Sequence, residues 1–161
     1  MALKRRMLLL AKWAEGVGVV GLWLMLGTTL WDVVGAKVFK APLSGAIELV
    51  SLVQLLAVGA GMAMTLMLRR HIQVEFLQAR FPSPIRRGVG ALSGLFIAAF
   101  FALMAHYTWR YAEMLAQTGE MLPGLRQPLY PFAYAFAALL ALNALYGLYL
   151  CLEALRNKER R

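Results

Sequence analysis

The stretch from Leu49 to Leu68 reads LVSLVQLLAVGAGMAMTLML and contains no charged side chain. An α-helix needs about 20 mostly apolar residues to cross the hydrocarbon core of a bilayer. A membrane-spanning β-strand would instead alternate apolar and polar residues over about ten positions, and this stretch shows no such alternation. It therefore predicts a transmembrane helix.

Three more apolar runs of similar length occur in the chain, and we predict four spans at about 14–34, 46–68, 88–110 and 129–152. Helices are expected because they satisfy every backbone polar group in lipid without forming a closed barrel. The loops are too short to fold as soluble domains. The sequence predicts an all-α, integral membrane four-helix bundle that forms a single domain over residues 1–161.

The formal net charge of +9 raises the question of nucleic-acid binding. However, the basic residues lie just outside the apolar runs, where cytoplasmic loops of membrane proteins carry them. They gather before the first run, between the second and third, and after the fourth: Lys4, Arg5, Arg6, Lys12, Arg69, Arg70, Arg80, Arg86, Arg87, Arg156, Lys158, Arg160 and Arg161. We predict that both termini and the central loop are cytoplasmic, with no nucleic-acid partner.

The N-terminal 30 residues share some features with a signal peptide, because Lys4-Arg5-Arg6 precedes an apolar stretch and Val34-Gly35-Ala36 resembles a cleavage site. The stretch exceeds the usual apolar region of about 7 to 15 residues. Trp31 and Asp32 also crowd the site. We expect a retained first span.

Small and polar residues mark three possible packing strips. In the second span, Ser51, Gln54, Gly61 and Thr65 fall within less than a quarter turn of one another. The other strips are Gly90-x-x-x-Gly94 in the third span and, in the fourth, Ala133, Ala137, Asn143, Ala144, Gly147 and Cys151. Each strip can contact another helix of this bundle or another subunit.

The segment Gly16-Val17-Gly18-Val19-Val20-Gly21 has the glycine spacing of a dinucleotide-binding loop. That loop requires a preceding strand and a following soluble helix. Here the glycines open a membrane span, where small residues permit close helix packing. We predict a packing role for them.

Catalytic and cofactor chemistry has little support in the sequence. The carboxylates are predicted near span ends or in loops, with Glu113 and Glu120 in the outer loop. His71 and His106 raise the possibility of haem, but the predicted topology separates them in depth by roughly 25 Å. We expect His106 to be partly buried near the outer interface, and we predict no enzyme activity, metal or cofactor.

A resemblance appears around the second span. Three stretches carry it: the entry Ala41-Pro42-Leu43-Ser44-Gly45-Ala46-Ile47-Glu48-Leu49, the exit Arg70-His71-Ile72-Gln73-Val74-Glu75-Phe76-Leu77 and the break at Phe81-Pro82. Together they resemble the small permease subunit of TRAP transporters, the DctQ family. Chain length, four spans and the predicted topology extend the resemblance to nearly the whole chain. Glu75 stands where that family often has Asp, and Lys40 where it often has Asn.

The resemblance implies a bacterial inner-membrane protein within a sodium-coupled importer of organic acids. A periplasmic substrate-binding protein would deliver substrate to a large permease subunit, which holds the substrate and ion sites. The small subunit would dock on the large one and widen its stationary scaffold. The transported substrate cannot be predicted from this chain.

Candidate contact residues follow from this resemblance and the topology. Glu48 is expected either to interact with the dipole of its own helix or to contact the large subunit. The interface with the partner subunit or with lipid comprises Glu48, Ser51, Gln54, Gly61, Thr65, Arg69, Arg70, His71, Glu75 and Arg80. Candidate contacts with the periplasmic protein are Lys37, Lys40 and Arg126.

The basic elbow after the second span has two interpretations. Arg69, Arg70 and His71 can bind phospholipid headgroups, or His71 can pair with Glu75 or with the partner subunit. The following segment 75–87 is predicted to form a short amphipathic interfacial helix in the cytoplasmic loop. A different class of function also stays open, namely a free-standing four-helix membrane protein, either a homo-oligomeric small transporter or a haem-bearing anchor.

Overall fold

A computed structural model describes residues 2–67 and 83–156. These residues form four α-helices: α1 (Ala2–Val38), α2 (Ala46–Met67), α4 (Ser83–Thr118) and α5 (Tyr130–Arg156). The described part of the chain has no β-strand, and its one isolated β-bridge joins Met121 to Pro128. The predicted all-α four-helix architecture is therefore confirmed.

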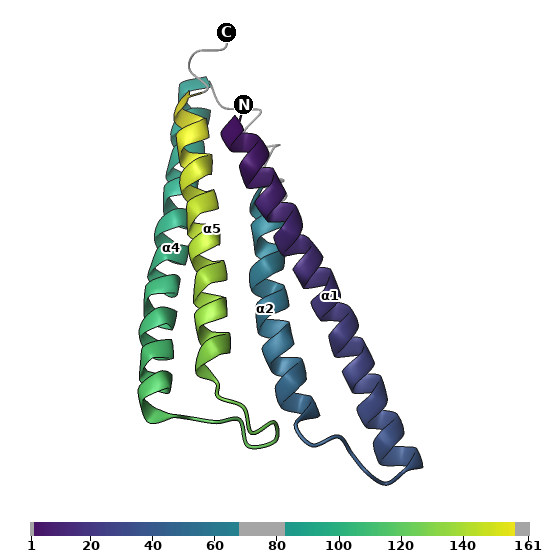
Figure 1. Cartoon of the computed structure of the whole chain (residues 1–161). Coiled ribbons are helices and arrows are strands. Elements are labelled where there is room, and N and C mark those ends of the chain that lie inside the picture. Colours follow the sequence, from purple (N-terminus) through teal and green to yellow (C-terminus); the bar gives the residue numbers. More distant parts are fainter. Residues whose placement is uncertain (1, 68–82, 157–161) are drawn as a thin grey trace.

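The four helices form two antiparallel pairs, α1 with α2 and α4 with α5 (Figure 1). Contacts between α2 and α5 join the two pairs. The pairs converge at the end that holds both termini and diverge toward the end that holds the loops 39–45 and 119–129 (Figure 1). Both termini lie at the same end of the bundle, as expected for an even number of antiparallel helices.

Two of the helices extend well beyond the predicted spans. Helix α1 has 37 residues and α4 has 36, so at 1.5 Å per residue each is about 55 Å long. A bilayer core is only about 30 Å thick, and such helices must tilt or continue beyond it. The predicted third span ended with the apolar run, at about residue 110, so the prediction that Glu113 lies in the outer loop was wrong. Glu113 lies in α4, where it accepts a hydrogen bond from Trp109 Nε1 at 3.0 Å.

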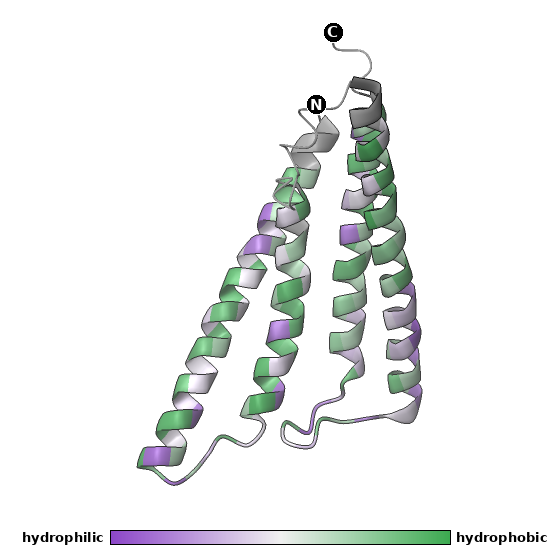
Figure 2. Cartoon of the chain, turned by 180° about the vertical axis from the view of Figure 1, so that it is seen from behind, coloured by the Kyte–Doolittle hydropathy of each residue, from purple (hydrophilic) through white to green (hydrophobic). Residues whose placement is uncertain are grey.

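Three helical segments in the described ranges are long and apolar enough to cross a membrane: Met7–Val38, Gly88–Thr118 and Tyr130–Leu155. A shorter apolar segment, Ala46–Met62, lies within α2. Figure 2 shows apolar residues around most of the helical surfaces, a distribution that suits a lipid environment. Helix α1 continues without interruption through Val34-Gly35-Ala36, the site that resembled a cleavage signal.

Glycines set the close packing of α4 against α5. A β-carbon at Gly94 would lie 2.6 Å from the backbone nitrogen of Cys151, and one at Gly147 would lie 2.6 Å from that of Ala98. Only glycine permits backbones to approach this closely, as in other small-residue helix contacts in membranes. Gly94 of the third-span strip and Cys151 of the fourth-span strip therefore meet within this chain, and Gly147 packs on α4 at Ala98.

The glycines near the start of α1 also serve packing. A β-carbon at Gly18 would lie 3.3 Å from the carbonyl oxygen of Ala57, and one at Gly21 would lie 3.2 Å from the Ala57 side chain. Both contacts are with α2. The predicted packing role is confirmed for Gly18 and Gly21, whereas a β-carbon at Gly16 would meet nothing within 4 Å.

Polar contacts connect the two helix pairs at mid-height and at the convergent end. The Asn143 side chain, fully buried on α5, donates to the carbonyl oxygens of Gly59 at 3.0 Å and Leu139 at 2.9 Å. The Tyr146 hydroxyl donates to the carbonyl oxygen of Met7 at 2.8 Å and so joins α5 to the start of α1. These bonds complement the close contact of Gly59 with Phe136.

The predicted amphipathic segment 75–87 lies mostly outside the described residues, which resume at Ser83. Residues 83–87 form the beginning of α4. Pro84 falls in its first turn, a position where the missing amide hydrogen of proline costs nothing.

Candidate functional site

Glu48 connects the two helix pairs at their divergent end. Its carboxylate lies in the first turn of α2 and accepts hydrogen bonds from the loop 119–129, which approaches from the α4–α5 pair. Oε1 accepts from Gly124 N at 2.9 Å, and Oε2 accepts from Gly124 N and Leu125 N, both at 3.0 Å. Bonds to a charged acceptor are about twice as strong as neutral ones. We call this contact, comprising Gly45, Glu48, Gly124 and Leu125, the outer latch.

Two glycines allow the outer latch to close. A β-carbon at Gly124 would lie 2.6 Å from the Cα of Gly45, and Gly45 itself has a φ of 82°. Residues with a side chain rarely adopt this left-handed conformation. The loop thus reaches the start of α2 backbone to backbone, and the carboxylate of Glu48 satisfies the amides that this approach brings together.

The same end of the molecule exposes cations. Lys37, Lys40 and Arg126 are exposed, and both Lys40 (φ 53°) and Arg126 (φ 50°) adopt the left-handed conformation. Two nearby carboxylates are engaged with backbone amides, since Asp32 Oδ1 accepts from Leu43 N at 2.8 Å and Glu48 holds the outer latch, while Glu120 is exposed in the same loop as Arg126. Lys37 and Lys40 at the end of α1, together with Arg126 in the loop between α4 and α5, therefore present a positive surface.

One face of α2 contacts no other helix of the described chain. Val53 and Ala57 face α1, and Gly59 faces α5. On the remaining side, Ile47, Ser51, Gln54, Val58 and Met62 are exposed, and Gly61 and Thr65 are partly exposed. A β-carbon at Gly61 would meet nothing within 4 Å. We call this surface the free face of α2.

The polar residues of the free face differ in how they are satisfied. Ser51 Oγ donates to the carbonyl of Ile47 at 2.8 Å, and Thr65 Oγ1 donates to that of Gly61 at 3.1 Å, so both hydroxyls bond to their own helix. The Gln54 amide has no hydrogen-bond partner among the described residues. Transfer of an unpaired amide from water to a medium that cannot form hydrogen bonds, such as the bilayer core, costs on the order of 4–8 kcal/mol.

Other predicted residues are not brought into this arrangement. Five of the predicted interface residues lie outside the described ranges: Arg69, Arg70, His71, Glu75 and Arg80. His106 is exposed on α4, where its ring meets that of Tyr107 edge to face at 5.7 Å, so the expectation that it is partly buried was wrong. Within the described residues, no group of three His, Cys, Asp or Glu side chains could hold a metal ion.

A comparison with protein-family models assigns the fold to a known group. Residues 25–157 match the model described as "Tripartite ATP-independent periplasmic transporters, DctQ component". The chain belongs to the DctQ family. The match includes all of α2, the outer latch and the described part of α5, and it confirms the resemblance noted in the sequence.

Neither the curated proteins nor the solved structures gave a significant match to this DctQ chain. Membership nonetheless makes it the small membrane component of a TRAP transporter, a family of transporter parts and not of enzymes. A tripartite system also implies two further proteins.

The outer latch is the feature that the sequence analysis missed in this DctQ protein. Glu48 was recognised as a candidate, and Leu122-Pro123-Gly124 has the composition of a turn. Their contact spans 76 positions in the chain, and no local pattern reports such a pairing. Gly45 and Gly124 were the sequence feature that came closest to indicating this contact, since loop glycines often mark a close approach of two backbone segments.

Proposed function

We propose that this chain is the small permease subunit of a sodium-coupled inner-membrane importer of organic acids, C4-dicarboxylates or similar carboxylates. It docks on the large permease subunit through the free face of α2 and widens that subunit's stationary scaffold. The observation that carries the proposal is the Gln54 amide, which is exposed on a helix face that the described residues leave uncovered. A large membrane partner would supply both the cover and the hydrogen bond.

The scaffold role is supported by the way the two helix pairs are held. Contacts between α2 and α5 join them, and the outer latch adds a charge-assisted bond at the end where they diverge. A stationary element must resist the force of a moving partner, and a second attachment point restricts relative motion of the pairs. The family's substrate and ion sites belong to the large subunit, and the described part of this chain has no charged side chain in the middle of α2 or α5.

The positive surface of Lys37, Lys40 and Arg126 supports a second contact, with the periplasmic substrate-binding protein. Exposed charges of one sign accelerate the encounter with an oppositely charged partner. With the termini cytoplasmic, this surface lies on the periplasmic side. Increasing salt is then expected to weaken the association.

A test of docking compares substitutions at two glycines, one on the free face of α2 and one on α1. Gly61→Leu adds a side chain to the free face of α2, and Gly27→Leu adds one to α1, at positions where a β-carbon would meet nothing within 4 Å. The tagged full chain is purified in mild detergent from its native membrane, and co-purifying proteins are identified by mass spectrometry. We expect the wild type and Gly27→Leu to retain a large polytopic membrane protein and Gly61→Leu to lose it.

Two results would contradict the proposal. In one, the wild-type chain purifies alone as a stable homo-oligomer. In the other, Gly61→Leu retains the large protein as fully as Gly27→Leu does, which would remove the free face from the docking surface. Uptake of labelled dicarboxylates in cells that carry the same variants then tests whether docking is needed for transport.

A further inference from the structure

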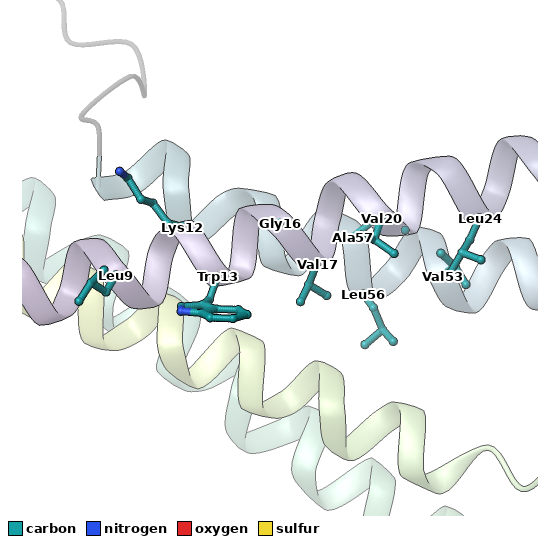
Figure 3. A pocket seen from close by; sticks show the side chains of 11 residues that line it. Leu9, Lys12, Trp13, Gly16, Val17, Val20, Leu24, Val53, Leu56 and Ala57 are labelled. Atoms are coloured by element: carbon teal, nitrogen blue, oxygen red, sulfur yellow. The ribbon is translucent and has the colours of Figure 1, made fainter.

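A groove runs along the α1–α2 pair and has a volume of about 710 Å³ (Figure 3). Helix α1 lines it from Leu9 to Leu24, and α2 contributes Val53, Leu56 and Ala57. Every lining residue is apolar or glycine except Lys12. The volume is within the range of ligand-binding pockets, about 300–1,000 Å³.

The length of the groove matches one leaflet of a bilayer. From Lys12 to Leu24 the helix rises by about 18 Å at 1.5 Å per residue. Half of a hydrocarbon core of about 30 Å is about 15 Å. A transmembrane helix of a partner would need a surface that crosses both leaflets, so this groove fits a lipid acyl chain better.

The groove is shaped by glycines and bordered by an aromatic ring. Figure 3 shows Trp13, Val17 and Leu56 projecting to the same side of the α1–α2 pair. Gly16 lies in the wall between them, and a β-carbon there would meet nothing within 4 Å. The missing side chain leaves room for an alkyl chain along α1.

The charge at one end of the groove specifies the headgroup. Lys12 is exposed, and among the described residues no carboxylate lies within ion-pair distance of its ammonium. Trp13 is 75% exposed beside it, and tryptophan favours the headgroup level of a membrane. A cation and an indole at the mouth of an apolar groove are complementary to an anionic phospholipid.

We propose that this groove binds one anionic phospholipid from the leaflet on the side of the chain termini. The phosphate pairs with Lys12, and an acyl chain lies over Gly16 and along Val17 and Val20 as far as Leu24. The α1 wall of the groove ends just before residue 25, where the family match begins, whereas its α2 wall lies inside that match. The bound lipid fills the space beside α1 and supports the long helix against α2.

The test measures lipids retained by the tagged full chain after purification in mild detergent from its native membrane. Lipids are extracted and quantified per polypeptide by mass spectrometry. Gly16→Leu fills the groove, Val20→Trp fills it from a neighbouring position that is 59% exposed, and Gly27→Leu is the control on the same helix. We expect the wild type and Gly27→Leu to retain an anionic phospholipid, and both filling variants to lose it.

Lys12→Gln tests the headgroup assignment. One cation near a membrane surface contributes about 1 kcal/mol to the binding of anionic lipid. We therefore expect the ratio of anionic to zwitterionic lipid retained to fall by about five-fold. Lys37→Gln, at the other end of α1, is expected to leave this ratio unchanged.

Three results would overturn the proposal. Equal lipid retention by Gly16→Leu, Val20→Trp and Gly27→Leu would remove the groove as the binding site. An unchanged lipid ratio in Lys12→Gln would remove the anionic headgroup. Loss of the large partner protein in the filling variants, with lipid retained, would show that a partner helix occupies the groove.

Discussion

The two antiparallel pairs of this bundle differ in how closely their glycines pack the helices together. In the α4–α5 pair, glycines on each helix meet the backbone of the other, at Gly94 against Cys151 and at Gly147 against Ala98. In the α1–α2 pair, glycines support only part of the contact, and residues 2–67 and 83–156 leave a groove and the free face of α2 uncovered. We call α4–α5 the closed pair, because its glycines close the contact between the helices, and α1–α2 the open pair. Both pairs expose apolar side chains, and Leu92, Phe96 and Phe100 of α4 are 68%, 72% and 51% exposed.

We therefore expect one pair to determine the stability of the fold and the other to determine what the protein binds. Substitutions in the closed pair are expected to damage the fold itself, because no space exists for an added atom. Substitutions on the open pair are expected to leave the fold intact and to affect what binds to it. The variants below test that separation, from the largest expected effect to the smallest.

Gly147→Leu breaks the closed pair. A β-carbon at this position would already lie 2.6 Å from Ala98 N and 2.9 Å from the Ile97 side chain. We expect a loss of about 3 kcal/mol, at the upper end of ordinary overpacking costs, and a large drop in yield from the membrane. Thermal unfolding in detergent, followed by circular dichroism, measures the loss. Gly61→Leu on the open pair serves as control, and equal destabilisation by both would contradict the comparison.

Glu48→Gln breaks the attachment between the pairs. Glutamine keeps one neutral acceptor oxygen and replaces the other with an NH2 group, which cannot accept a bond from Gly124 N or Leu125 N, so it cannot reproduce the bonds that both carboxylate oxygens now accept. We expect a loss of about 2 kcal/mol, typical of hydrogen bonds to a charged group in a partly buried position. Hydrogen exchange of the amides of Gly124 and Leu125 is expected to accelerate. Glu120→Gln, at an exposed carboxylate in the same loop, is the matched control, and slow exchange in Glu48→Gln would contradict this role of the carboxylate.

Asn143→Leu sharpens the comparison at the junction of α2 and α5. The substitution removes the bonds to Gly59 and Leu139 and keeps the number and branching of the side-chain heavy atoms. Hydrogen bonds between membrane helices contribute about 0.6 kcal/mol on average and up to about 1.7 kcal/mol. We expect a loss of about 1 kcal/mol in the unfolding measurement, without loss of the large partner. A destabilisation as large as that of Gly147→Leu would mean that polar contacts dominate the junction.

Lys40→Gly has the smallest expected effect, and its sign is opposite. Lysine at a φ of 53° is strained, and glycine adopts this conformation freely. The greater freedom of glycine in the unfolded chain offsets part of the gain. We expect a net stabilisation of about 0.5 kcal/mol together with weaker salt-sensitive binding of the periplasmic protein. Destabilisation would show that the Lys40 side chain makes a favourable contact that offsets the strain.

The sequence predicted the features that depend on composition and local spacing. Helix number, the common side of both termini and the family could be read from apolar runs, basic loops and the motif around Glu48. The lengths of α1 and α4 could not, because polar residues such as Glu113 continue a helix beyond its apolar run. The side of each helix that is covered also depends on tertiary packing. The small residues of α5 therefore proved to be internal, whereas Ser51 and Gln54 proved to be exposed.

The outer latch and the groove needed three-dimensional information for a different reason. Glu48 and Gly124 are far apart in sequence, and either residue alone is compatible with an ordinary loop or helix end. Lys12 and Trp13 read as interfacial residues on any first span. Their relation to Gly16 and Leu56 emerges only when α1 and α2 are packed together.

The most direct test of the docking claim places a photoreactive amino acid at Val58, on the free face of α2, and at Leu103, on α4, in otherwise identical full chains. Both side chains are about half exposed, at 49% and 57%. After irradiation of native membranes, cross-linked proteins are identified by mass spectrometry. The account predicts that Val58 gives an adduct with a large polytopic membrane protein and that Leu103 does not. Adducts from Val58 only with lipid or with a second copy of this chain would contradict it.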